Sequence, residues 1–171
     1  MGYDFSNTIA ILGVTVTAVA TLFAILAYTE WRYLKKFRQE LESELKKSKD
    51  EIAKNFNATH KVIASYAVQD VDARISLLKS ALDISPKVYN GYNTLGYAYV
   101  EKKQYDAAIE SFTKACVYFS EDPAGYCDLA YVYLLNQNKE ACKSKLQKAI
   151  SIDRKQEEII KSDPRFQGIL E

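Results

Sequence analysis

The fold is decided by two adjacent stretches that carry one pattern, YNGYNTLGYAYVEKKQYDAAIESFTKACVYFSED at residues 89–122 and PAGYCDLAYVYLLNQNKEACKSKLQKAISIDR at residues 123–154. Moving forward by 34 residues from each landmark of the first stretch reaches a similar residue in the second. The landmarks are Tyr92, Leu95, Gly96, Tyr99, Ala108, Phe112 and Ala115, and their counterparts are Tyr126, Leu129, Ala130, Tyr133, Cys142, Leu146 and Ala149. A fixed period of this kind indicates a stack of repeated structural units.

The period and these residues resemble the tetratricopeptide repeat, in which each unit is a pair of antiparallel helices. Small residues such as Gly96 and Ala108 stand where helix backbones must touch, and large residues such as Leu95 and Phe112 fill the space between helices. The resemblance implies an all-α solenoid that binds other proteins, and it implies no chemistry.

A third unit is predicted upstream, because one helix pair cannot bury its apolar face alone. Stepping back by 34 residues from Phe112 and Ala115 finds Leu78 and Ala81, and Pro86 follows where a helix-ending proline is expected. We therefore expect repeats at 55–88, 89–122 and 123–154, which together form a domain over 55–154, with a first helix at about 55–68.

The C-terminal segment, residues 155–171, is predicted to be a capping helix that covers the last repeat. Ile159 and Ile160 are expected to point inward, and Phe166, Ile169 and Leu170 to complete the cover. The alternative is that these apolar side chains occupy the binding groove and block it.

Residues 9–29 are predicted to form a transmembrane helix that contacts membrane lipid, after a short extracytoplasmic segment at 1–8. No charged residue lies between Phe5 and Thr29, and some twenty apolar residues match a hydrocarbon core of about 30 Å. Basic residues follow the span at Arg32, Lys35 and Lys36, which predicts an outside N-terminus and cytoplasmic repeats. A cleaved secretory signal is the alternative, but such signals carry positive charge before the apolar run.

Residues 30–54 are predicted to form an amphipathic juxtamembrane stalk helix, which can continue the span as one rod. Its apolar stripe, which includes Leu34, Phe37, Leu41 and Leu45, could pack on the first repeat, stay solvated, or pair two copies as a short coiled coil. Small residues on one face of the span could also let two spans pack closely, in a homo-oligomer or a membrane complex. These residues are Gly13, Thr17, Thr21 and Ala24.

The sequence argues against several classes of function. Acidic and basic residues are equally numerous from residue 57 to the C-terminus, so no basic surface for nucleic acid is expected. His60 is the only histidine, and Cys116, Cys127 and Cys142 match no zinc or redox spacing. We expect no cofactor, no metal and no enzymatic activity, and free thiols suit a reducing compartment.

Binding is expected in the concave groove that, in proteins resembling this one, is lined by the first helix of each pair. Tyrosines on that face predict an aromatic, mainly apolar groove, although some of them could instead fill the interior. The predicted partner-binding residues are Asn90, Asn93, Tyr97, Val100, Glu101, Cys127, Tyr131 and Leu134.

Taken together, these features predict an all-α, single-pass membrane protein with a transmembrane helix, a stalk helix, a short α-solenoid of about three helix pairs and a capping helix. The predicted role is an adaptor or scaffold that binds a protein or peptide partner on the cytoplasmic side. The alternative is a structural subunit of a larger membrane complex, held mainly through its span and stalk.

Overall fold

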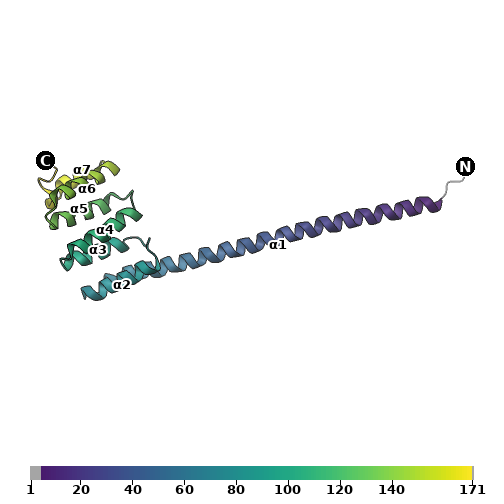
Figure 1. Cartoon of the computed structure of the whole chain (residues 1–171), viewed down its shortest axis with the longest axis horizontal. Coiled ribbons are helices and arrows are strands. Elements are labelled where there is room, and N and C mark those ends of the chain that lie inside the picture. Colours follow the sequence, from purple (N-terminus) through teal and green to yellow (C-terminus); the bar gives the residue numbers. More distant parts are fainter. Residues whose placement is uncertain (1–4, 171) are drawn as a thin grey trace. The chain divides into compact units, whose positions relative to one another are not determined.

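The computed structural model describes residues 5–170 and divides the chain into two units, Met1–Glu51 and Ile52–Glu171. All regular elements among the described residues are helices, so the all-α prediction is confirmed for this part of the chain (Figure 1). Residues 1–4 of the predicted extracytoplasmic segment, and the side chains of residues 9–11 of the predicted span, lie outside the described residues.

The first unit consists of the greater part of helix α1, which runs from Phe5 to Ser65. From Leu12 onward this helix is long and apolar enough to cross a membrane by length and composition, with a mean hydropathy of 1.9 in its most apolar window. Its large apolar side chains are exposed, for example Phe23 at 66% and Leu41 at 54%. The small side chains also leave one face open, since a Cβ atom added to Gly13 would meet nothing within 4 Å.

The second unit is a stack of helix pairs followed by a short terminal helix (Figure 1). The end of α1 forms the first pair with α2, because Ala58 and Val62 are buried in one core cluster with Leu78 and Ala81. The remaining elements are α2 (Val71–Ile84), α3 (Gly91–Glu101), α4 (Tyr105–Tyr118), α5 (Pro123–Leu135), α6 (Lys139–Ile152), α7 (Gln156–Ser162) and the 3-10 helix η1 (Pro164–Phe166).

The repeated landmarks form the core of this unit. Phe112, Leu129 and Leu146 are at most 2% exposed, and each belongs to a cluster that joins neighbouring helices. Gly96 shows why the pattern needs a small residue, because a Cβ atom there would lie 2.7 Å from the ring of Phe112. The aromatic ring of one helix therefore packs directly on the backbone of its partner.

The turns inside the second and third pairs repeat as closely as the helices do. Lys103 and Gln137 both adopt the left-handed conformation, with φ of 57° and 59°. In each turn the next residue closes the preceding helix, with Gln104 N donating to Tyr99 O at 2.9 Å and Asn138 N to Tyr133 O at 2.8 Å. These bonds satisfy carbonyls that the end of a helix would otherwise leave unpaired.

The C-terminal segment caps the stack, as predicted. Ile160 and Phe166 are 2% and 4% exposed and share a core cluster with Leu146 of α6. The inward placement of Ile159 is wrong, since this side chain is 56% exposed. A helix of this length presents only one narrow face to its neighbour, and Ile160 takes that face.

Candidate functional site

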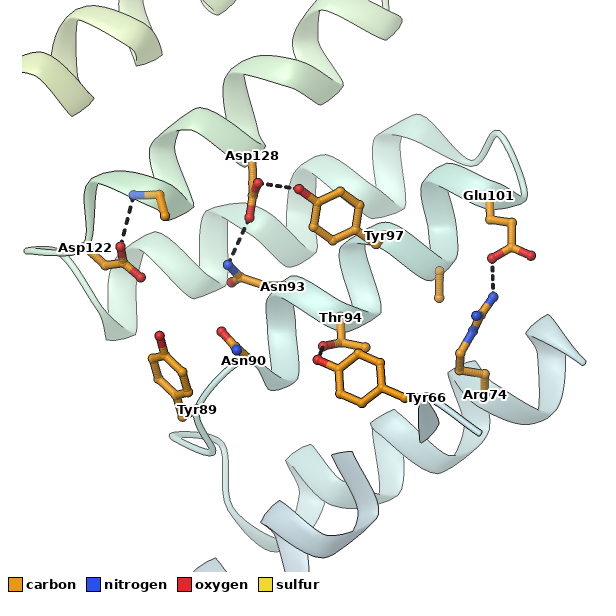
Figure 2. A pocket seen from close by; sticks show the side chains of 12 residues that line it. Tyr66, Arg74, Tyr89, Asn90, Asn93, Thr94, Tyr97, Glu101, Asp122 and Asp128 are labelled. Carbon is orange, nitrogen blue, oxygen red and sulfur yellow. Dashed lines mark hydrogen bonds and ion pairs between the residues drawn. The ribbon is translucent and has the colours of Figure 1, made fainter. Parts of the chain in front are cut away.

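A groove of about 460 Å³ lies over α3, between the start of the stack and the first turns of α5 (Figure 2). Tyr89 and Asn90 stand at one end, and Arg74 with Glu101 at the other. All of its lining residues belong to the second unit. They are Tyr66, Arg74, Tyr89, Asn90, Asn93, Thr94, Tyr97, Ala98, Glu101, Asp122, Ala124 and Asp128.

Helix α3 supplies the floor of the groove, because Asn93, Tyr97 and Glu101 stand four residues apart on one helical face. Asn90 precedes the helix in the left-handed conformation, with φ of 59°, which asparagine tolerates better than most residues. The opposite face of α3 carries Leu95, which is buried in the core. The repeat pattern that builds the core thus also fixes which side chains face the groove.

Asp128 of α5 is the polar centre of the groove. Asn93 Nδ2 donates a hydrogen bond to its Oδ2 at 3.1 Å, and the hydroxyl of Tyr97 donates to its Oδ1 (Figure 2). Burial raises the pKa of the Asp128 carboxyl, while these two hydrogen bonds oppose the rise. Burial and the neighbouring Asp128 also raise the pKa of Tyr97, so the phenol stays protonated and remains a donor.

The other end of the groove is held by contacts between α3 and the first helix pair. Arg74 of α2 forms an ion pair with Glu101, and the hydroxyl of Tyr66 lies 3.0 Å from Oγ1 of Thr94 (Figure 2). Arg74 is the better buried partner of that ion pair, with 20% of its side chain exposed. These contacts position Tyr66 and Glu101 along the same groove.

Four of the predicted partner-binding residues line this groove: Asn90, Asn93, Tyr97 and Glu101. The other four lie outside it. Val100 packs against the cluster around Phe112, and the remaining three pack against the cluster that contains Ile160 and Phe166. The C-terminal cap therefore gives α5 a partner on the face where an open groove was expected. Those three residues are Cys127, Tyr131 and Leu134.

Several residues of the groove were not predicted, and Asp128 is the most important of them. It stands 34 residues after Thr94, which also lines the groove, so the repeat period itself could have indicated it. Arg74 and Asp122 lie outside the helices on which the prediction focused, and no sequence signal marks them. Tyr66 was expected only as an upstream extension of the groove.

The tyrosines divide between the groove and the core. Tyr97 is 41% exposed and lines the groove, with its ring edge packed on Phe112 at 5.1 Å between ring centroids. Tyr92, Tyr99 and Tyr133 are half-buried and pack against the core clusters. The groove is more polar than predicted, because carboxylates and amides line it together with the aromatic rings.

Within the described residues the structure offers no arrangement typical of metal binding, since no three His, Cys, Asp or Glu side chains come together. The three thiols are free, and burial raises the pKa of both Cys116 and Cys127 to about 11. Thiols of this kind are protonated near neutral pH and are poor nucleophiles. The arrangement of the groove is suited to holding another molecule by hydrogen bonds, charge and aromatic contact.

Comparison with known families agrees with this architecture. Residues 96–137 match a model described as TPR repeat, and residues 123–156 match one described as tetratricopeptide repeat. The repeat unit belongs to the tetratricopeptide repeat (TPR) family. The two matches cover α3 to α6, and the TPR landmarks Gly96, Phe112 and Leu146 lie inside them.

Solved structures show the same TPR fold. The chain is similar to a MamA RS-1 ArsTM double mutant, at 18% identity and a TM-score of 0.52, with 61% of this chain and 58% of that chain covered. It is also similar to the APC/C hetero-tetramer Cut9-Hcn1, at 23% identity and a TM-score of 0.55, with 67% and 23% covered. A third similar structure is YrrB, "a TPR protein with an unusual peptide-binding site", at 20% identity and a TM-score of 0.50, with 61% and 53% covered.

The chain thus spans little more than half of the first of these structures and less than a quarter of the second. At these identities the likeness concerns the fold alone. No curated protein matches the chain in sequence.

Proposed function

We propose that the chain is a membrane-anchored TPR adaptor that binds a protein or peptide partner in the groove over α3, on the cytoplasmic side of a membrane. The observation that carries the proposal is the groove itself, an open cavity of about 460 Å³ whose aromatic and polar side chains converge from several helices. A site of this size and mixture is typical of peptide and ligand recognition. The family supports this role, because TPR proteins are generally protein-interaction modules.

The anchor and its orientation rest on the N-terminal helix. Its apolar stretch is long enough to span a bilayer, and basic residues such as Arg32 and Lys36 follow it. The same orientation would place the free, protonated thiols of the repeats in a reducing compartment.

The groove is tested by filling it from a position that does not disturb the core. Ala124 is exposed, lines the groove and lies in the first turn of α5, where its N–H donates to the capping Asp122 at 3.0 Å. Ala73 is a matched control, because it is exposed in the first turn of α2, donates to the capping Asp70 at 3.2 Å and does not line the groove.

The experiment is crosslinking and affinity capture from native membranes with the full chain and its Ala124→Trp and Ala73→Trp variants. We expect a partner that the wild type and Ala73→Trp capture and that Ala124→Trp loses, because the indole occupies the space of the ligand. Equal capture by all three proteins would contradict binding in this groove.

The alternative, a structural subunit held through span and stalk, has one observation in its favour. The apolar stripe of the stalk is exposed along its length, with Leu34, Phe37 and Leu45 between 49% and 59% exposed. In the span, Thr17 and Thr21 satisfy their hydroxyls on carbonyls of their own helix, which leaves a face suited to close packing. Under this alternative, Gly13→Leu with Thr17→Leu would abolish co-purification of the partner, and Ala124→Trp would not affect it.

A further inference from the structure

The charges in the groove do not balance. Its lining includes three carboxylates and one basic side chain, Arg74, which is already in an ion pair with Glu101. Asp122 is engaged in capping α5. Asp128 is contacted only by the neutral donors Asn93 and Tyr97, and no salt bridge joins it to any residue in the described part of the chain.

Asp128 therefore has room for a cationic donor. A carboxylate offers about four lone-pair positions, and here each oxygen accepts a single hydrogen bond. The side chain is half-buried, and a carboxylate in that position is stabilised by an opposite charge nearby. A guanidinium or ammonium group that entered the groove would meet an acceptor already aligned by α3.

The chain itself places an arginine close to this position. Arg165 of η1 lies over the ring of Tyr131, with Cζ 4.9 Å from the ring centroid, and is forked onto Asp163 with Nη2 to Oδ2 at 2.6 Å. Its charge reaches the groove, because it lowers the pKa of both Tyr97 and Asp128 against the larger effect of burial. Arg165 does not line the groove, so the space in front of Asp128 stays open.

We propose that the groove selects extended partner segments that carry an arginine or lysine, whose cationic head group docks on the carboxylate of Asp128. The tyrosines along the groove, Tyr66, Tyr89 and Tyr97, offer ring faces and hydroxyls to the neighbouring side chains of that segment. Arg165 stands beside the same carboxylate and repels the incoming cation, which sets the affinity lower than the groove alone would allow. This inference rests on the proposed function, since it names the chemistry of the partner.

The first test presents the full chain, in detergent micelles, with a displayed library of random peptides, and sequences the peptides that are captured. We expect enrichment of arginine and lysine over aspartate and glutamate, and loss of that enrichment with Asp128→Asn, which keeps the size of the side chain. Captured peptides without a basic preference would overturn this inference and leave the adaptor role standing. Failure to capture any peptide that Ala124→Trp excludes would overturn both.

The second test measures the contribution of the charge directly. A captured peptide is compared with the same peptide carrying citrulline, which is neutral and of equal shape, in place of arginine. We expect citrulline to weaken binding to the wild type by at least about tenfold, as for the loss of a charge-assisted hydrogen bond, and to weaken binding to Asp128→Asn by less than about twofold. Equal affinities of the two peptides for the wild type would refute the assigned contact.

A third variant keeps the inference testable even where Asp128→Asn fails to fold. Arg165→Gln removes the competing charge and should tighten binding of the arginine peptide about two- to fivefold at low salt, since surface charges act at this range. Arg154→Gln is the matched control, because Arg154 is also exposed but does not perturb Tyr97 or Asp128. Unchanged affinity in Arg165→Gln would contradict the competition.

Discussion

At the scale of single residues, two helical glycines of the repeat unit have opposite roles. A Cβ atom on Gly96 would lie 2.7 Å from the ring of Phe112, whereas on Gly125 it would meet only Sγ of Cys116 at an ordinary 3.6 Å. Gly96→Ala should therefore destabilise the unit by about 1–3 kcal/mol through overpacking. Gly125→Ala should be neutral or stabilise it by up to about 1 kcal/mol through helix propensity.

Chemical unfolding of the two variants, followed by circular dichroism, measures this difference. The two substitutions are chemically identical, so their difference reports the close approach of α3 to α4 alone. Equal midpoints would mean that Phe112 shifts without cost.

The carboxyl of Asp128 gives stability a pH dependence of known sign. Burial raises its pKa in the folded state above the ordinary value, so its contribution to stability is largest below that value and is lost as the pH rises through the folded-state pKa. Asp128→Asn removes this loss. We expect the melting temperature of the variant, relative to the wild type, to rise between about pH 4 and pH 7, because ordinary aspartate titrates near about 3.9.

Thermal melts of both proteins across that pH range give the comparison. A difference that is constant with pH would show that the hydrogen bonds from Asn93 and Tyr97 fully compensate the burial of the charge.

The residues that could and could not be predicted differ in kind. Leu95, Phe112 and Leu146 follow a fixed period because every repeat must solve the same packing problem, and all three are buried. Asp128 belongs to no such pattern, since a groove side chain is chosen for a ligand and can differ from one repeat to the next. The repeat thus fixes where the groove lies and leaves its chemistry free.

At the scale of elements, the turns inside the helix pairs store a small cost. Lys103 and Gln137 occupy the left-handed region, where a Cβ atom is unfavourable by roughly 1–2 kcal/mol. Glycine removes that cost but loses more chain entropy on folding. We expect Gln137→Gly to stabilise the repeat unit by about 0.5–1 kcal/mol, whereas Asn136→Gly, at φ of −85°, should destabilise it.

Denaturant midpoints of these two neighbouring variants provide the measurement. If both were destabilising, the left-handed turn would be held by contacts of the Gln137 side chain and not by backbone geometry.

The elements also show where sequence reasoning was least complete. The first helix of the first repeat lacks the repeat signature, and it was predicted only because α2 needed a partner. The structure supplies that partner from the end of α1, with Ala58 and Val62 buried. On the third pair, the sequence placed Tyr131 in the groove because the distance to the C-terminal cap cannot be read from the period.

At the scale of the whole molecule, the two units should respond differently to denaturant. The repeat unit has buried cores, whereas the apolar part of α1 is exposed along its length. If that helix spans a membrane, its backbone cannot exchange hydrogen bonds with water in a detergent core, so it should stay helical. Urea should therefore remove only part of the helical signal of the full chain in micelles.

The thiols provide an independent reading of the same experiment, because all three lie in the repeat unit. Labelling of Cys116 and Cys127 should be slow in the folded protein and should become fast at the midpoint of the partial loss of helical signal, since burial holds their pKa at about 11. Complete loss of the helical signal in one transition would argue against a membrane-embedded helix.

The cap formed by α7 and η1 determines how long the array can be. Ile160 and Phe166 cover the side of α6 on which a further helix pair would stack. Additional repeats would therefore have to be inserted ahead of Lys155, because units appended behind the cap would find no apolar surface. Without the cap, that surface would be a sticky end, open to the first free helix of a neighbouring copy, and the chain would tend to polymerise. This short C-terminal segment is thus the terminator of the solenoid.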